Sequence, residues 1–315
     1  MSEQGSISSA SGQHLYGGTY SWQQYAAQRP AYPQHALDSI IAHHAANGNQ
    51  WELAADFGTG MGTLVPFLLH KFQHVSASDI NEAQIKEARQ HFEKLIDKQQ
   101  IPSSLDFHVA RAEEPHPWLP EGSVDLCIAG EAVHWFNAKE WMARCARLLR
   151  PGGTIAFLLY PPTSTIISNP RASACLSKVL VEGVGSALHL GMKELFASAA
   201  QELKFDPALF EHESRIHYIL PNGLRDPCLI IGEQQGLNFA KLDNTVQFRE
   251  EPVIKRGCTV QDVQDYYQTV AGIPENVMIL PAWQQTLNTI EEEVHGEKGV
   301  FDMAWPIWLC MASKR

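Results

Sequence analysis

The sequence has little that suits a metalloprotein, a disulfide-bonded secreted domain or a membrane protein. Its six cysteines are scattered over 315 residues, and no two of them form a C-x-x-C pair, the spacing typical of zinc and redox sites. No window approaches the run of about 20 apolar residues that a membrane span needs, and the Ser- and Gly-rich start has no apolar signal region. We therefore predict a cytoplasmic protein with free thiols, no metal and no membrane partner.

Positive charge is also scarce. The chain has 24 Lys and Arg against 35 Asp and Glu, a formal net charge of -11. Because such a charge repels polyanions, we expect no nucleic-acid partner. Hydrophobic residues at 44% and charged residues at 19% are ordinary for a globular protein. We therefore expect a folded chain, either a monomer or a homodimer, that is disordered only in a tail over residues 1–15.

Short apolar runs alternate with amphipathic stretches from residue 53 to residue 160. This alternation predicts strands connected by helices, and hence an α/β fold with a doubly wound parallel sheet. Prolines break the pattern after residue 160, and it returns near residue 241, where Thr245 to Ile254 and Phe301 to Ala312 are expected strands. The predicted organisation is a core over 16–160, a helical substrate lid or insertion over 161–240, and a C-terminal completion of the core sheet over 241–315.

A glycine-rich stretch, Asp56-Phe57-Gly58-Thr59-Gly60-Met61-Gly62, follows the first expected strand. It is not the G-x-G-x-x-G of a nicotinamide enzyme, because Thr63 occupies the third glycine position. Asp56 would oppose a phosphate at the start of the next helix, whereas it would attract a cation. The loop therefore favours a ligand with an ammonium group and a sulfonium, such as S-adenosylmethionine. A tight turn without a ligand is the alternative.

Acidic residues end the next two expected strands. Asp79, followed by Ile80, comes 21 positions after Gly58, and a carboxylate there can accept both hydroxyls of a ribose. Its alternative role is a charge at the N-terminus of the helix that begins near Asn81. At the end of the third strand, Ala112 and Glu113 are candidates for contact with an adenine edge.

These features resemble the class I S-adenosylmethionine-dependent methyltransferases. The segments TYSWQQYAAQRPAYP, DFGTGMG, VDLCIAGEAVHWF and LLRPGG are similar to the branch that contains the trans-aconitate methyltransferases, the type 11 methyltransferases. The resemblance covers residues 16–160 and implies a Rossmann-like seven-stranded sheet, mostly parallel with one antiparallel strand. Residues 161–240 match no pattern of that family.

The resemblance implies S-adenosylmethionine as the cofactor and a pairing of Arg29 with its methionine carboxylate, although Arg29 also fits a surface charge. Trp22 and Tyr25 lie three positions apart, so that both can face the sulfonium or form a hydrophobic clamp. The expected cofactor-binding residues are Trp22, Tyr25, Arg29, Asp56, Gly58, Thr59, Gly60, Asp79, Ile80, Ala112, Glu113, Gly130 and Glu131.

The resemblance also implies methyl transfer to an oxygen of a small molecule. The preferred acceptor is the carboxylate of an organic acid, giving a methyl ester, and a phenol or other natural-product hydroxyl comes second. His134 is a candidate general base for a hydroxyl, whereas a carboxylate needs no base; lining the pocket is its other role. We expect Trp135, Tyr160 and Tyr267 in the substrate pocket.

An acidic substrate calls for a cation in addition to Arg29. The candidates are Arg171, Lys193, Arg215 and Arg225. Two other functions stay open at this point: a protein of this fold that binds the cofactor without transferring its methyl, and a nicotinamide oxidoreductase, which Asp56 disfavours.

Overall fold

The structure is a computed structural model. It describes residues 27–47, 50–98, 104–187 (backbone alone for 184–187), 195–196, 198, 200, 203–234, 246–270, 277–294 and 299–315. The expected tail, Trp22, Tyr25 and Lys193 lie outside these residues.

The main sheet has eight strands in the order β3-β2-β1-β4-β5-β11-β7-β8. β11 runs antiparallel to both of its neighbours, and each of the other pairs is parallel. The Rossmann-like fold is confirmed, but the strand number of seven is corrected to eight, because β8 adds an edge strand beyond β7. The strands are β1 (Leu53–Phe57), β2 (His74–Asp79), β3 (Leu105–Val109), β4 (Val124–Gly130), β5 (Leu149–Leu159), β7 (Phe210–Tyr218), β8 (Val246–Arg249) and β11 (Ile307–Lys314).

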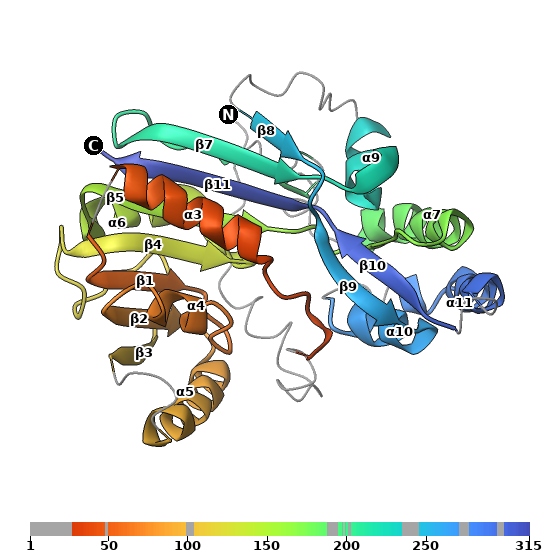
Figure 1. The fold of residues 1–315 in the computed structure, drawn as a ribbon, viewed down its shortest axis with the longest axis horizontal. Coiled ribbons are helices and arrows are strands. Elements are labelled where there is room, and N and C mark those ends of the chain that lie inside the picture. The colour runs from red at the N-terminus through yellow and green to blue at the C-terminus, as the bar shows by residue number, and fades with distance from the viewer. Residues whose placement is uncertain are drawn as a thin grey trace.

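Helices cover both faces of this sheet, as parallel strands with nearly continuous apolar runs require. α3 (Gln34–Asn47) crosses in front of β5 and β11 in Figure 1, and α6 (Ala138–Leu148) lies behind them. α4 (Val65–Leu69) follows β1, and α5 (Glu82–Asp97) follows β2. Asn81 caps α5 as predicted, because its side chain accepts hydrogen bonds from two backbone N–H groups of the first turn.

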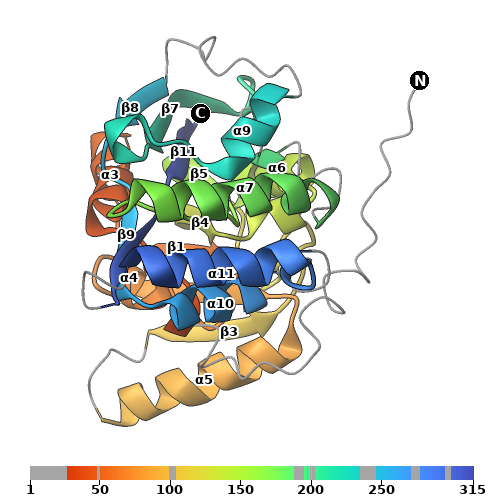
Figure 2. The same ribbon diagram turned by 90° about the vertical axis from the view of Figure 1, so that its right-hand side faces the viewer.

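A second layer lies beyond the carboxyl ends of β4 and β5 (Figure 1). It contains a three-stranded sheet of order β6-β10-β9 and three helices, of which α7 and α11 run side by side (Figure 2). We refer to this layer as the cap. Its elements are β6 (Thr165–Ile166), α7 (Pro170–Ala187), β9 (Val253–Cys258), α10 (Val260–Gln268), α11 (Pro281–Val294) and β10 (Phe301–Trp305).

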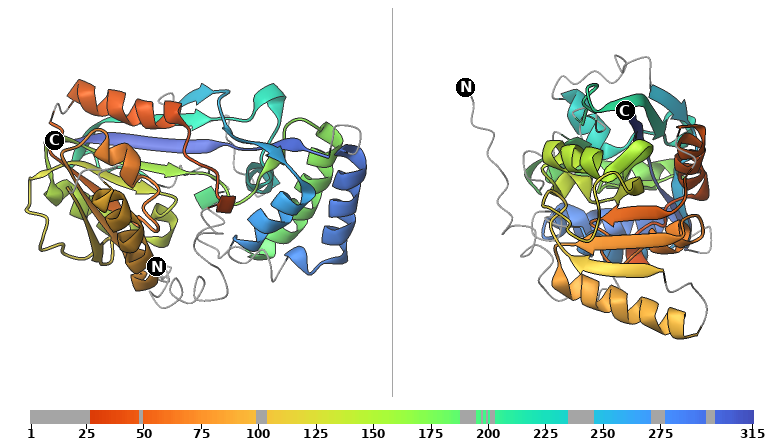
Figure 3. Two further views of the ribbon diagram at one scale, coloured as in Figure 1. Left: turned by 60° about the horizontal axis from the view of Figure 1, so that its bottom comes forward. Right: turned by 90° about the vertical axis from the view of Figure 1, so that its left-hand side faces the viewer.

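The two sheets do not follow the expected boundaries at residues 161 and 240. The range 161–240 contributes β7 to the main sheet, whereas 241–315 contributes β9, β10, α10 and α11 to the cap. The expected single strand from Phe301 to Ala312 is interrupted at Pro306, which has no N–H to donate to a ladder. β10 therefore lies in the cap and β11 in the core, and these C-terminal strands extend through both layers (Figure 3).

The expected strand from Thr245 to Ile254 is likewise divided between β8 and β9. Two short elements, η1 (Val133–Trp135) and α9 (Pro227–Gln234), follow β4 and β7. Among the described helices, none combines the length and the apolarity required to cross a bilayer.

Candidate active site

The glycine loop after β1 packs closely against neighbouring side chains. Gly58, Gly60 and Gly62 have φ of 68°, 57° and 82°, a region in which glycine avoids the steric cost of a side chain. A Cβ on Gly58 would lie 2.4 Å from the Cβ of Ala132. The loop between β1 and α4 therefore lies directly against the segment that follows β4.

Asp56 is fully buried at the end of β1. Its Oδ2 accepts a hydrogen bond from Thr59 Oγ1 at 2.6 Å, while its Oδ1 has no hydrogen-bond partner among the described residues. Burial, with a smaller contribution from Asp79, raises the pKa of Asp56 to about 7. A buried carboxyl that lacks a partner is stabilised in its charged form by an approaching cation.

Asp79 connects the loop to β2. Its Oδ2 accepts from the N–H of Gly60 at 2.9 Å, and its Oδ1 accepts from the N–H of Asn81 at 2.8 Å. Burial raises its pKa, and hydrogen bonds from the backbone of Asn81, Gly60 and Ile80 oppose this rise. Asp79 thus positions the glycine loop, and the half-buried Ile80 follows it directly.

The segment after β3 is joined to the segment after β4. Ala112 is buried, and Glu113 Oε1 accepts from the N–H of Asn137 at 2.7 Å. Glu113 Oε2 lies 3.8 Å from Arg111 Nε. The predicted adenine-contacting residues therefore lie at the same edge of the sheet as the loop after β4.

The residues after β4 combine close packing with a rare backbone conformation. A Cβ on Gly130 would lie 2.6 Å from the Tyr32 hydroxyl oxygen. Glu131 has φ of 50°, a rare conformation for a residue with a side chain, and such conformations cluster at functional sites. Its carboxylate accepts a hydrogen bond from the N–H of Tyr160. Burial raises the pKa of Glu131 to about 8, although the charge of Arg29 opposes this rise.

Arg29 lies at this edge rather than on an open surface. Its Nη2 donates to the carbonyl of Thr269 at 2.8 Å, and its Cζ lies 5.6 Å from the centre of the Tyr266 ring. Its charge also acts on both Glu131 and His134. The structure thus brings Arg29 to the residues after β4, while its pairing with the methionine carboxylate stays a prediction.

His134 is neutral at pH 7 in this environment. Desolvation, followed by the charge of Arg29, lowers its pKa to about 3. Its Nδ1 is buried and has no hydrogen-bond partner among the described residues. The ring centroid lies 5.2 Å from that of the half-buried Trp135 and 5.4 Å from that of Phe196. Such a ring is a weak base.

Tyr160 and Tyr267 are both buried. The Tyr267 hydroxyl lies 2.9 Å from both the backbone nitrogen and the Oγ of Ser164, and its ring packs against Trp283. These contacts place Tyr267 in the interior of the cap. Tyr160 instead donates its N–H to Glu131 and so lies at the site.

The arginines expected to receive an acidic substrate are occupied by other contacts. Arg171 is 83% exposed and pairs with Glu293 at 3.2 Å. Arg215 donates to the backbone carbonyls of Ala200 and Leu203 and to Glu213. Arg225 forms a two-bond ion pair with Glu233.

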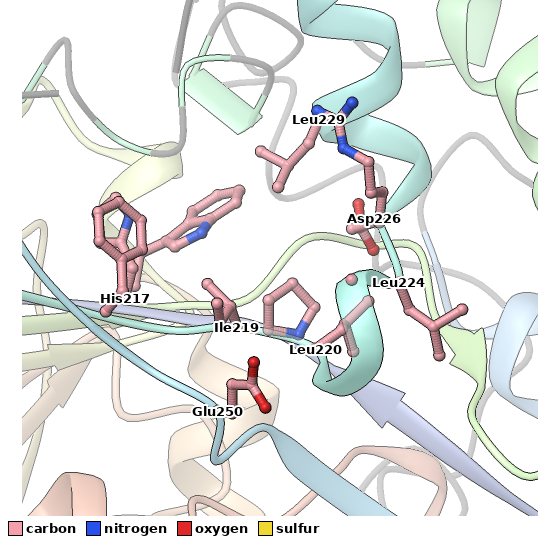
Figure 4. Close-up of a pocket in the computed structure, with 12 residues that line it drawn as sticks. His217, Ile219, Leu220, Leu224, Asp226, Leu229 and Glu250 are labelled. Carbon is pink, nitrogen blue, oxygen red and sulfur yellow. The ribbon is translucent and has the colours of Figure 1, made fainter. Parts of the chain in front are cut away.

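Sequence reasoning missed a cavity of about 280 Å³ between β7, β8, β11 and α9 (Figure 4). Its residues lie up to 91 positions apart in the chain, so no local sequence pattern predicts the cavity. The available signal was the Asp226-Pro227 pair, because a proline at the first helical position predicts the start of a helix, here α9. The cavity is lined by His217, Ile219, Leu220, Gly223, Leu224, Arg225, Asp226, Leu229, Phe248, Glu250, Pro306 and Trp308.

Comparisons with known proteins agree with this geometry. Residues 55–157 match the family described as methyltransferase domain. Methyltransferase AacuQ of Aspergillus aculeatus is 26% identical over 311 residues, 93% of each chain. Methyltransferase cfoB of Aspergillus candidus is 31% identical over 142 residues, which cover 44% of this chain and 42% of the relative.

Among solved structures, a putative type II methyltransferase from Anaeromyxobacter dehalogenans has the same fold. Its TM-score is 0.54 at 20% identity, over 90% of this chain and 97% of the other. Taken together with the family match, the sheet order and the glycine loop, these similarities identify residues 55–157 as a class I S-adenosylmethionine-dependent methyltransferase domain, and the chain as a methyltransferase.

Proposed function

We propose that the chain transfers a methyl group from S-adenosylmethionine to a hydroxyl oxygen of a neutral small molecule. The observation that carries this proposal is the half-buried Glu131, which has a positive φ at the carboxyl end of β4, where the charge of Arg29 acts on it, and whose pKa is raised to about 8. The competing acceptor is the carboxylate of an organic acid, which the resemblance favours.

The residues after β1 and β2 fit the cofactor. The buried, unpartnered Oδ1 of Asp56 suits an ammonium group, and Asp79 suits the ribose hydroxyls. Arg29 would pair with the amino-acid carboxylate, and Ile80, Ala112 and Glu113 would flank the adenine. When bound, S-adenosylmethionine supplies an electrophilic methyl group on a sulfonium.

A carboxylate acceptor lacks support from the three described arginines that the sequence offered for it. Arg171, Arg215 and Arg225 each form ion pairs or backbone hydrogen bonds within the protein. Freeing Arg215 would be costly, because this guanidinium is buried and would lose its ion pair with Glu213. Since Arg29 would bind the carboxylate of the cofactor, a carboxylate acceptor would require one of these arginines to leave its present partner, whereas a neutral acceptor would not.

A hydroxyl acceptor has a proton to lose, and Glu131 is the better of two candidates to take it. As the new O–C bond forms and the C–S bond breaks, the hydroxyl proton would pass to the Glu131 carboxylate. A general base works best when its pKa lies near the working pH, and the pKa of Glu131 is about 8. The pKa of His134, about 3, makes its ring a weak proton acceptor. His134 then lines the site and orients the acceptor.

The test is transfer of labelled methyl from S-adenosylmethionine to matched pairs of acceptors, such as 2-naphthol and 2-naphthoate. We expect base-stable label on the naphthol, because an aryl methyl ether survives mild alkali and a methyl ester does not. Label that is confined to base-labile esters would refute the hydroxyl proposal in favour of the carboxylate. No label on either member of several such pairs would refute both.

A further inference from the structure

The cavity in Figure 4 lies on the face of the main sheet from which His217 and Trp308 project. His217 of β7 is the register partner of Trp308 of β11, which is in turn the partner of Leu159 of β5. Side chains of directly paired residues project from one face of a sheet. The cavity thus begins at β11, the strand next to β5, at the carboxyl edge of β5 where the methyl group would be transferred.

Phe196 connects the cavity to the candidate active site. Its ring centroid lies 5.4 Å from that of His134 and 6.1 Å from that of Trp308, which lines the cavity. His217 continues this aromatic row, at 6.4 Å from Trp308 and 5.7 Å from Phe248. A flat acceptor lying along the row would reach from the cavity towards His134 once the Phe196 ring turned aside.

Most of the cavity wall is apolar, and its rim is open to solvent. Leu220, Leu224 and Leu229 line it together with Trp308, and Figure 4 shows Leu229 and Ile219 on opposite sides of the space. Phe248 is 53% exposed, although large aromatic side chains are usually covered. The Phe248 ring thus borders the cavity on the edge strand β8 and leaves this side of it accessible from solvent.

Two buried polar side chains on the wall each have an atom without a hydrogen-bond partner among the described residues. Asp226 is fully buried, and its Oδ1 accepts from Thr163 Oγ1 and from the N–H of Cys228, both at 2.7 Å. Its Oδ2 has no partner among the described residues, nor has Nε2 of His217, which is 2% exposed. Buried polar atoms are nearly always hydrogen-bonded in folded proteins. These two atoms therefore point to a polar ligand group as the missing partner.

We propose that this cavity binds the ring system of the methyl acceptor, a neutral hydroxylated molecule of about two fused rings, with Asp226 and His217 holding a second hydroxyl. This inference rests on the proposed function. A cavity of about 150 Å³ holds one benzene ring, so 280 Å³ accommodates roughly twice that. A hydroxyl suits the wall because it donates to a carboxylate oxygen and also exchanges a hydrogen bond with an imidazole nitrogen.

The charged side chains on the cavity wall disfavour an acidic ligand. Asp226 and Glu250 carry the acidic groups, and the Arg225 guanidinium is held by Glu233. At pH 8, where the Asp226 carboxyl is mostly charged, an anionic ligand would meet it without a free counter-ion, which is unfavourable in a site of low dielectric. The cavity thus discriminates between a phenol and the matching carboxylate of the same ring.

Calorimetry on the full chain saturated with S-adenosylhomocysteine tests the assignment without requiring methyl transfer. The probes are 2,6-dihydroxynaphthalene and 2,6-naphthalenedicarboxylate. We expect the diol to bind, and Leu229→Trp, which fills the cavity, to weaken it by tenfold or more. Ile279→Trp is the matched control, because Ile279 is 71% exposed and does not line the cavity; the affinity for the diol should not change.

Asp226→Asn separates charge from shape. The amide keeps the acceptor for Thr163 and Cys228 but removes the negative charge, so in calorimetry at pH 8 the diacid should gain at least fivefold in affinity relative to the diol. Circular dichroism melts confirm that each variant is folded. The proposal is overturned if the diol fails to bind at millimolar concentration or binds wild type and a folded Leu229→Trp equally. Diol binding without methylation would instead refute the proposed function and leave this pocket assigned.

Discussion

Gly58 and Gly122 offer a comparison that isolates the packing of the glycine loop. Both have φ of 68°, but a Cβ on Gly58 would lie 2.4 Å from the Ala132 Cβ, whereas a Cβ on Gly122 would have no heavy atom within 4 Å. An alanine in this region costs about 1–2 kcal/mol through its backbone conformation alone. Overpacking in a core adds about 1–3 kcal/mol. Gly122→Ala should therefore lower the free energy of unfolding by about 1–2 kcal/mol, and Gly58→Ala by about 2–5 kcal/mol.

Urea unfolding followed by tryptophan fluorescence gives both values, and calorimetry with S-adenosylmethionine gives the cofactor affinity of each variant. We expect Gly122→Ala to bind the cofactor as wild type does, and Gly58→Ala to bind it more weakly. Ala132→Gly in the Gly58→Ala background should recover part of the lost stability, because it removes the atom that clashes. If the two glycine variants differ by less than about 0.5 kcal/mol, the loop does not contact the segment after β4 as described.

Three further outcomes follow from the charges at the site and the cavity. Asp79→Ala should weaken S-adenosylmethionine binding at least tenfold in calorimetry while leaving the far-ultraviolet spectrum unchanged; unchanged affinity would remove Asp79 from the site. Glu131→Gln should lower kcat by about 10²–10⁴-fold and abolish the rise of kcat with pH towards pH 8, whereas His134→Ala should keep that rise; a rise that survives in Glu131→Gln would contradict the assignment. Burial raises the pKa of Asp226 from 3.8 to about 7, so its stabilising effect is complete below pH 3.8 and is lost as pH rises through 7, by about 4 kcal/mol. Urea unfolding at pH 5 and pH 8 should show that Asp226→Asn loses less stability over this interval than wild type; equal losses would refute the raised pKa.

The sequence predicted the first half of the fold well because its signals there are local. Apolar runs of five to seven residues became β1 and β4, and Asn81 became the cap of α5. The glycine loop and Asp79 were brought together because the carboxyl ends of parallel neighbours share one edge. In each of these cases the pattern and the structural consequence lie within about 30 residues, the size of one βαβ unit.

The second half was harder to predict because strands that are adjacent in the chain belong to different sheets. β8 and β9 are separated by three residues, yet one pairs with β7 in the core and the other with β10 in the cap. Hydrophobic periodicity identifies a strand but not its partner. The prediction of a lid over 161–240 therefore included β7, whose role depends on residues almost a hundred positions later.

The low basicity of His134 was also beyond prediction, since it depends first on desolvation in the folded protein and then on Arg29, which lies more than a hundred positions earlier in the chain. A histidine after the fourth strand is an obvious candidate base when only its pKa of about 6.5 in water is considered. Burial removes the water that would stabilise the imidazolium, and a nearby guanidinium opposes its charge. The same desolvation has the reverse effect on Glu131, because burial disfavours the charged form of either group. One environment thus weakens the histidine as a base and strengthens the carboxylate, which is why the proposed base is Glu131, three positions before the residue that the motif suggests.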